Sequence, residues 1–289
     1  MCERDDFQEF ATRSLDLTRR EFGAMALGAG LAAAIPKIAN AVETSGGPVD
    51  VKTPDGVADA YFVHPQQGQH PGVLIWPDIF GLRPTFQQMA TRLAESGYAV
   101  LVINPFYRKQ KAPTAPPNPD FNDSATRDAL LGLAGSLTPE TAATDAKAFV
   151  AFLDGQRSVD HKRRLATTGY CMGGPFVLRA AGAFPDRIGA GATFHGGGLV
   201  TDKPDSPHLL IPSMNAHFLI AIAESDDKKE PQDKGVLRTA FTNAHLPAEI
   251  EVYAGTQHGW CPPDSRVYDR APAEKAWSRM LALFSESLA

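Results

Sequence analysis

The chain has 289 residues, of which 43% are hydrophobic and 21% charged, as expected for a globular protein with one large or two small domains. Its formal net charge is −5, and its basic residues form no cluster with aromatic residues, so no nucleic-acid-binding surface is expected. The eight histidines are scattered and match no metal-binding pattern. We therefore predict neither a metal site nor a cofactor.

The first 41 residues have the pattern of an export signal. Arg19-Arg20 precedes a weakly apolar segment at 22–35, and Ala39-Asn40-Ala41 is a small-x-small cleavage site. This order resembles a twin-arginine signal and implies recognition by the twin-arginine translocation machinery, with the periplasm as destination. The segment is shorter than the roughly 20 residues that cross a bilayer, so no stable membrane anchor is expected. A short amphipathic helix with a chance arginine pair is the alternative.

The remaining residues, 42–289, are predicted to form one α/β domain. A hairpin around Pro54-Asp55-Gly56 is followed by alternating strands and helices, which indicates a mostly parallel, twisted sheet with helices on both faces. The expected strands are 48–52, 58–64, 72–76, 98–103, 164–170, 188–194, 217–223 and 248–253, and the expected helices are 85–96, 124–137, 139–154, 172–183, 232–244 and 272–288. Ligands of such sheets bind at the carboxyl ends of the strands.

A candidate nucleophile lies between the strand 164–170 and the next helix. Gly169-Tyr170-Cys171-Met172-Gly173 has the G-x-S-x-G form of a nucleophile elbow, with cysteine at its centre. The central residue of this tight turn is strained, and the glycines allow strand and helix to pack closely. The helix amino terminus behind Cys171 favours a thiolate. An inert buried cysteine in a glycine-rich turn is the alternative.

Candidate partners of Cys171 follow two later strands, in the chain order of α/β-hydrolases. His258 follows the last strand and suits a general base, whereas Asp226 follows the preceding strand and suits the carboxylate that fixes the histidine tautomer. Asp227 and Glu224 remain alternatives for this acid.

An oxyanion hole requires two backbone N–H groups close to the nucleophile. Met172, directly after Cys171, is one candidate donor, and Ile79, in the loop after the first buried strand, is the other. His195 ends another strand and either lines the same pocket or has a structural role. Cys261 is either an unpaired cysteine that packs as a small hydrophobic residue or the partner of Cys171 in a disulfide, which would block the nucleophilic thiol.

These motifs together resemble the dienelactone hydrolase family, the carboxymethylenebutenolidases, over nearly all of the mature chain. The resemblance rests on 77–81 (PDIFG), 97–100 (GYAV), 169–174 (GYCMGG), Asp226, 258–260 (HGW) and the tail at 268–277. It implies a single α/β-hydrolase domain and hydrolysis of a small ester or lactone. In this family a cysteine, an aspartate and a histidine form the catalytic triad, at positions that correspond here to Cys171, Asp226 and His258.

The chain departs from the family pattern at two places. A family glutamate that contacts the resting thiol is replaced by Asp78, which is one methylene shorter. An arginine soon after the catalytic histidine holds the substrate carboxylate in the best-known members, whereas Trp260 and two prolines follow here, and Arg127 corresponds to a second family arginine. We therefore take Asp78, Arg127, His195 and Trp260 as candidates for thiol activation or substrate binding.

Two other functions fit the same residues. An envelope binding protein could keep the pocket without turnover, and the shorter Asp78 and the absent arginine favour that alternative. A thiol peroxidase or disulfide exchanger would need a resolving cysteine, and only Cys261 could serve.

Overall fold

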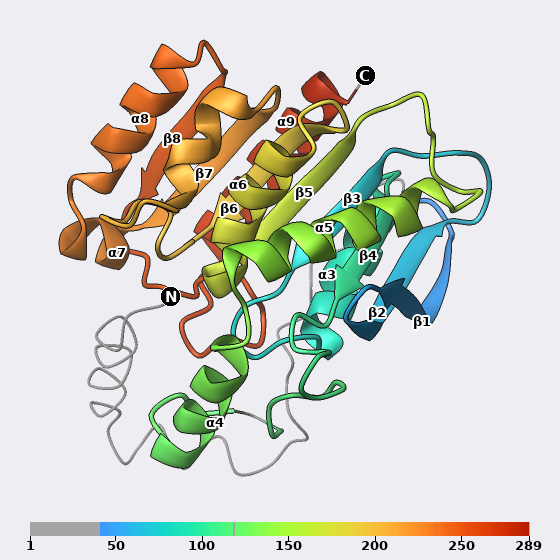
Figure 1. Ribbon diagram of the computed structural model, residues 1–289, viewed down its shortest axis with the longest axis horizontal. Helices are drawn as coiled ribbons and strands as arrows, with labels where there is room; N and C mark the ends of the chain where they lie inside the picture. The colour runs from blue at the N-terminus through green and yellow to red at the C-terminus, as the bar shows by residue number, and fades with distance from the viewer. Residues whose placement is uncertain (1–40, 118, 289) are drawn as a thin grey trace.

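The computed structural model describes residues 41–117 and 119–288, so the predicted export signal lies outside the described residues except for Ala41. Eight strands form one sheet in the order β1-β2-β4-β3-β5-β6-β7-β8 (Figure 1). The strands are β1 (Thr44–Thr53), β2 (Gly56–Pro65), β3 (Gly72–Trp76), β4 (Ala99–Ile103), β5 (Leu165–Tyr170), β6 (Ile188–Phe194), β7 (His217–Ala223) and β8 (Ala248–Tyr253). β1, β2 and β4 pair antiparallel and all other neighbours pair parallel, which confirms the predicted mostly parallel α/β sheet.

Helices cover both faces of the sheet, as Figure 1 shows. The helices are α3 (Pro84–Glu95), α4 (Ser124–Ala134), α5 (Pro139–Asp154), α6 (Gly174–Ala183), α7 (Glu224–Lys229), α8 (Asp233–Asn243) and α9 (Arg270–Ser287). Along β3, Leu74 and Trp76 point into a core with α5, α6 and α8, whereas Val73 and Ile75 point into a core with α3 and α9. This alternation follows from the two-residue period of a strand. It explains why the central strands are apolar throughout.

Three elements differ in kind from the sequence prediction, and two differ in length, because β1 starts at Thr44 instead of residue 48 and α4 ends at Ala134 instead of residue 137. The helix expected from Met172 begins as a short 3-10 turn, Cys171–Gly173, before α6. The helix α7 and a 3-10 segment, Pro207–Ser213, were not predicted. The six residues of α7, ESDDKK, are five charged residues and one serine, so the helix has no apolar periodicity. Its acidic first turn and its lysines in the last turn stabilise it through the helix dipole.

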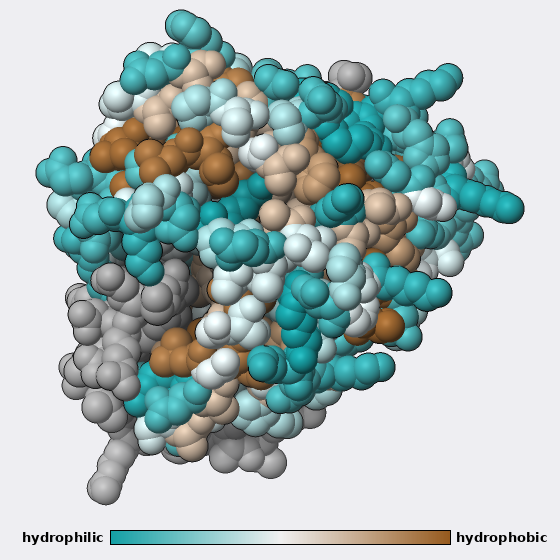
Figure 2. Space-filling model, in the orientation of Figure 1, coloured by the Kyte–Doolittle hydropathy of each residue, from teal (hydrophilic) through white to brown (hydrophobic). Residues whose placement is uncertain are grey.

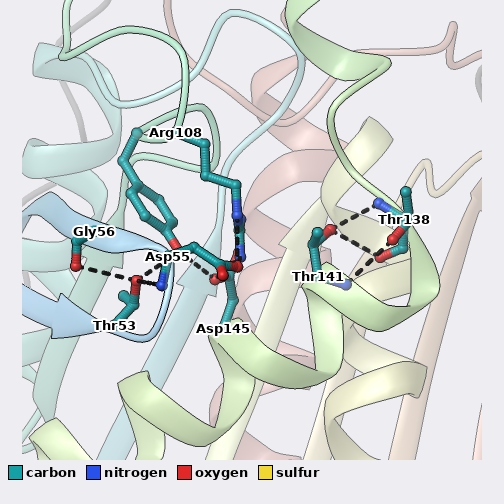
Figure 3. A network of polar contacts seen from close by, with 8 residues as sticks. Thr53, Asp55, Gly56, Arg108, Thr138, Thr141 and Asp145 are labelled. Atoms are coloured by element: carbon teal, nitrogen blue, oxygen red, sulfur yellow. Dashed lines mark hydrogen bonds and ion pairs between the residues drawn. The ribbon is translucent and has the colours of Figure 1, made fainter.

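A buried polar network ties α5 to the β1–β2 hairpin (Figure 3). The Asp145 carboxylate, 1% exposed, accepts hydrogen bonds from Tyr107 Oη at 2.7 Å and from both terminal nitrogens of Arg108 at 2.7 and 2.8 Å. Arg108 also donates to Asp55 in the hairpin turn. Burial raises the pKa of Asp145, and Arg108 and Tyr107 oppose that shift. The same helix starts with a capping box, in which Thr138 and Thr141 exchange side-chain and backbone hydrogen bonds.

The surface shows no large apolar face on the side drawn in Figure 2, where hydrophobic residues form small patches between hydrophilic ones. Across the part of the chain that the structure describes, the exposed large hydrophobic residues are Val42, Val57, Leu209 and Val236. No helix in these described ranges has both the length and the apolar character needed to cross a bilayer.

Candidate active site

The sheet order brings the candidate catalytic segments to one edge. β3 and β5 are parallel neighbours, with Trp76 opposite Gly169, so the loops that carry Ile79 and Cys171 start side by side. β7 and β8 are also neighbours, with Ala223 opposite Tyr253, so the loops that carry Asp226 and His258 do the same. Parallel strands end at the same edge, and the four segments therefore meet there.

The turn at Cys171 has the strained geometry of a nucleophile elbow. Cys171 has a φ of 52°, in the left-handed region that side chains other than glycine rarely adopt. The glycines on either side of it are needed for space. A Cβ at Gly169 would lie 2.2 Å from the Gly173 carbonyl oxygen, and one at Gly173 would lie 2.2 Å from the Trp76 carbonyl oxygen. The strand, the turn and the neighbouring β3 are thus packed backbone against backbone.

A hydrogen-bonded pair lies after β7 and β8. Nδ1 of His258 is 2.9 Å from Oδ2 of Asp226. The backbone N–H of His258 donates to Ser225 Oγ at 2.9 Å, and the Ser225 N–H donates to the Thr256 carbonyl at 3.2 Å. These contacts join the two loops and fix the orientation of His258 through its backbone as well as its ring. Ser225 and Thr256 were not identified from the sequence because neither belongs to a motif.

The two alternative acids contact other groups. Both oxygens of Asp227 accept from Lys234 Nζ, at 2.6 and 2.7 Å. Glu224 accepts from the Gly255 N–H and pairs with Lys228, and the hydrogen bond from Lys228 is the main cause of its lowered pKa. The geometry therefore favours Asp226 as the carboxylate that contacts the histidine.

A cavity of about 170 Å³ opens between these segments. Its described lining comprises Asp78, Ile79, Phe80, Arg83, Pro119, Phe121, Cys171, His195, His258, Gly259, Asp264, Ser265 and Arg266. Met172 follows Cys171 in the 3-10 turn, where the first backbone N–H groups have no acceptor within the turn. The structure thus brings Cys171, His258, Ile79 and Asp78 to one cavity, with Asp226 behind His258.

Asp78 is held by an arginine that the sequence motifs did not indicate. Arg83 Nη1 and Nη2 donate to the two oxygens of Asp78 at 2.6 and 2.9 Å, and the Phe80 N–H donates to Asp78 at 3.0 Å. Arg83 also contacts Asp264, through Nε at 2.7 Å and Nη2 at 2.9 Å. Burial raises the pKa of Asp78, whereas Arg83 opposes this shift. Arg83 and Asp264 are 181 positions apart, so only the folded chain reveals the pair.

His195 and Trp260 form the wall behind His258. The His195 ring meets the rings of His258 and Trp260 edge to face, with centroid distances of 5.2 Å in both cases. His195 is 1% exposed, and neither of its ring nitrogens has a hydrogen-bond partner among the described residues. Burial, and then the neighbouring His258, hold the pKa of His195 well below its ordinary value. Trp260 is fully buried and does not line the cavity.

The remaining candidates lie elsewhere. Arg127 is on α4, 3.8 Å from Asp128, and does not line the cavity, whereas Arg266, from the loop after β8, does. The two described cysteines are not joined by a disulfide, and Cys261 lies in a separate small space between Tyr170 and α9, where burial raises its pKa well above the ordinary value. Within the described ranges, no group of three or more histidine, cysteine, aspartate or glutamate side chains is arranged to hold a metal ion.

Sheet order, elbow and the site at the strand ends together define an α/β-hydrolase fold. Residues 58–288 match the family model described as "Dienelactone hydrolase family". The chain therefore belongs to the dienelactone hydrolase family, as its motifs predicted.

The individual relatives share less than 30% of their residues with this chain. The chain is 28% identical over 233 residues to an Escherichia coli (strain K12) protein named "Putative carboxymethylenebutenolidase", covering 78% of this chain and 82% of that one. It is 26% identical over 219 residues to the carboxymethylenebutenolidase of Rhodococcus opacus, covering 75% and 81%. A crystal structure named "Putative Dienelactone Hydrolase", from Klebsiella pneumoniae, aligns with a TM-score of 0.73 at 21% identity, covering 84% and 99%, and this likeness concerns the fold alone.

Proposed function

We propose that this protein is an exported hydrolase with a cysteine nucleophile, which cleaves a small carboxylic ester or lactone. Cys171 is the nucleophile, His258 the general base and Asp226 the carboxylate that orients His258. The observation that carries the proposal is the convergence of Cys171, in its left-handed turn, and the Asp226–His258 pair on one cavity. Family membership supports hydrolase chemistry of this kind.

In the acylation step, His258 Nε2 accepts the thiol proton, and the Cys171 sulfur attacks the substrate carbonyl carbon. The Nδ1 contact to Asp226 keeps Nε2 of the neutral ring available as the proton acceptor and stabilises the imidazolium that forms. The backbone N–H groups of Ile79 and Met172 are the proposed donors to the oxyanion. The carbon–oxygen bond then breaks, and the leaving alkoxide takes the proton from His258.

In the deacylation step, His258 removes a proton from water, and the resulting hydroxide attacks the thioester carbon. The carbon–sulfur bond breaks, the thiolate regains its proton from His258, and the carboxylic acid is released. For a lactone, the alcohol and the acid leave as one hydroxy acid. Neither acylation nor deacylation requires a cofactor, because His258 makes all the proton transfers.

Export is part of the proposal and rests on the sequence of the first 41 residues. The twin-arginine machinery is then a transient partner, and a small ester or lactone is the substrate in the periplasm.

The experiment is hydrolysis of 4-nitrophenyl acetate by the mature chain, with mass spectrometry of the quenched protein. Cys171→Ala should lower kcat/KM by about 10³-fold or more, because nucleophile and base act as a unit. An acetyl adduct should be found on the Cys171 peptide. Asp226→Asn should lower kcat by roughly 10³- to 10⁴-fold. Asp227→Asn, the matched control at the neighbouring carboxylate, should retain activity within a few-fold.

Two results would contradict the proposal. Cys171→Ala with near-normal kcat would exclude the thiol as nucleophile. Failure of all short esters and lactones, without any acyl adduct, would favour the binding protein over the hydrolase.

A further inference from the structure

The arginines around the cavity are paired with carboxylates, and this pairing affects which substrate charge the cavity can bind. Among the described lining residues, Arg83 and Arg266 are the arginines or lysines, and each is paired with a carboxylate. Arg83 contacts Asp78 and Asp264, and Arg266 contacts Asp120. Three carboxylates therefore face two guanidinium groups, so this cluster carries a net charge of −1 when all five are ionised.

Every N–H group of Arg83 is engaged. A guanidinium has five N–H donors, one on Nε and two on each terminal nitrogen. Nε donates to Asp264, Nη2 donates to Asp264 and to Asp78, and Nη1 donates to Asp78 and, at 3.4 Å, to the Gly81 carbonyl. The guanidinium also lies 4.9 Å from the Phe86 ring centroid. A substrate carboxylate could bind Arg83 only by displacing one of these acceptors.

Arg266 is also a poor binding site for a substrate carboxylate. It donates to Asp120 at 2.9 Å, and its side chain is 51% exposed, at the solvent side of the cavity. Attraction between exposed charges is weak and is screened by salt. The Asp120 carboxylate beside it would also repel an arriving anion.

Part of the cavity wall is apolar. Ile79, Phe80 and Phe121 line the cavity, and the two phenylalanine rings meet edge to face with centroids 6.3 Å apart. The volume of about 170 Å³ is similar to that of an engineered apolar cavity of about 150 Å³ that holds benzene. A ring or a short branched chain would therefore fit, whereas a carboxylate would lose its hydration without gaining a free cation.

Building on the proposed function, we propose that the cavity selects uncharged esters or lactones with a small apolar acyl group and discriminates against substrates that carry a carboxylate. The paired Arg83–Asp78–Asp264 cluster is the specificity device. Asp264 and Asp120 keep the guanidinium groups occupied, so that neither serves as a carboxylate clamp.

The first test needs no turnover. Iodoacetamide and iodoacetate have nearly the same size and differ in charge, and the Cys171 peptide can be followed by mass spectrometry. The ratio of their alkylation rates is normalised to the ratio for free 2-mercaptoethanol. We expect a normalised preference for iodoacetamide of roughly tenfold, as one unit of negative charge in a partly buried site would produce. A normalised ratio of one or less would overturn the proposal.

Substitutions test whether the charged residues around the cavity cause the preference for iodoacetamide over iodoacetate. Asp264→Asn releases two donors of Arg83 and removes one negative charge, so the preference for iodoacetamide should fall by roughly threefold or more. Asp120→Asn should act in the same direction through Arg266. Asp50→Asn is the matched control, because Asp50 is exposed on the edge strand β1 and does not line the cavity. An equal effect of Asp50→Asn would show that only overall charge matters and would overturn the assignment to the cluster.

The second test uses turnover of isosteric esters. The 4-nitrophenyl esters of 4-methylpentanoic acid and of succinic acid differ by two methyl groups in place of two carboxylate oxygens, and the succinamate ester is the uncharged polar control. The 4-methylpentanoate should be cleaved with the highest kcat/KM and the hemisuccinate with the lowest. If esters are cleaved and the hemisuccinate is preferred, the charge selection is wrong and the proposed function stands. If no ester is cleaved but the alkylation preference holds, the proposed function is wrong and the charge selection stands.

Discussion

The pairing of Asp78 with Arg83 places a carboxylate and a guanidinium on the cavity that Cys171 also lines. The family resemblance led us to expect a carboxylate here that senses the thiol. Asp78 instead has both oxygens within hydrogen-bond distance of Arg83. Any influence of Asp78 on the thiol is therefore shared with the arginine that it neutralises.

This arrangement predicts a faster reaction of the thiol in Asp78→Asn. Loss of the Asp78 charge changes the net charge of the Arg83–Asp78–Asp264 group from −1 to 0, and removing a negative charge near the sulfur favours the thiolate. The rate of Cys171 alkylation by iodoacetamide, measured against pH without substrate, should rise several-fold near pH 7, with a lower apparent thiol pKa. The control is Asp50→Asn. Superimposable curves for wild type and Asp78→Asn would mean that Asp78 does not sense the thiol.

His195 predicts a specific dependence of stability on pH. Its pKa in the folded protein is well below the ordinary value because of burial, so the unfolded chain binds a proton that the folded protein rejects as the pH falls below about 6.5. His195 therefore contributes a decrease in the free energy of unfolding between pH 7.5 and pH 5.5, of up to about 1.4 kcal/mol per pH unit. His195→Asn should reduce that decrease, since asparagine tolerates the positive φ of 42° and does not titrate.

The measurement is urea unfolding of both proteins at the two pH values. Only the change between pH values matters, so any constant loss of packing in the variant cancels. An identical pH dependence in wild type and His195→Asn would show that His195 is protonated to the same extent in both states.

At the scale of secondary structure, the central strands could be predicted from the sequence, whereas elements without a hydrophobic periodicity could not. The ranges 72–76, 188–194, 217–223 and 248–253 agree with β3, β6, β7 and β8, because strands covered on both faces, or bounded by clear turns, leave few alternatives. α7 is too short and too polar to be recognised. The position of Cys171 was predictable because the elbow is a local motif, whereas the contact of Arg83 with Asp264 depends on how two distant loops pack.

The network around Asp145 makes a prediction about how α5 is held. Asp145→Asn removes the buried charge that pairs with Arg108, so it should lower the free energy of unfolding by about 3 kcal/mol, at the low end for a broken buried pair because Asp55 still contacts Arg108. Arg279→Gln breaks the exposed pair with Glu249 and should cost about 0–1 kcal/mol. Urea unfolding of the two variants at pH 7 compares them. Equal losses would mean that the buried network contributes no more than a surface pair.

At the scale of the whole molecule, the residues directly after the predicted cleavage site are hydrogen-bonded to the folded domain. The Val42 N–H donates to the Glu95 carbonyl at 3.2 Å, and the Glu43 carbonyl accepts from the Gln66 N–H at 2.9 Å. β1 follows from Thr44. A chain that starts at Val42 therefore keeps these contacts.

We predict that export depends on the arginine pair, which lies outside the described residues. Arg19→Lys combined with Arg20→Lys should block translocation, because twin-arginine signals are recognised through this pair. N-terminal sequencing of protein from the cell envelope should find a start near Val42 in the wild type. A purified chain that begins at Val42 should unfold in urea with the same midpoint as exported material. Envelope protein with an intact Met1 would contradict this prediction.

The separation of the two described thiols gives the protein a built-in pair of chemical reporters. Cys171 lines the cavity at the strand ends, whereas Cys261 is packed against Tyr170 and α9, on the other face of the sheet. One reagent therefore labels them by different routes. Labelling of Cys171 reports whether the cavity is occupied, and labelling of Cys261, whose buried thiol has a raised pKa, should become faster when α9 moves away from the sheet. A single time course, read at two peptides, separates ligand binding from local unfolding.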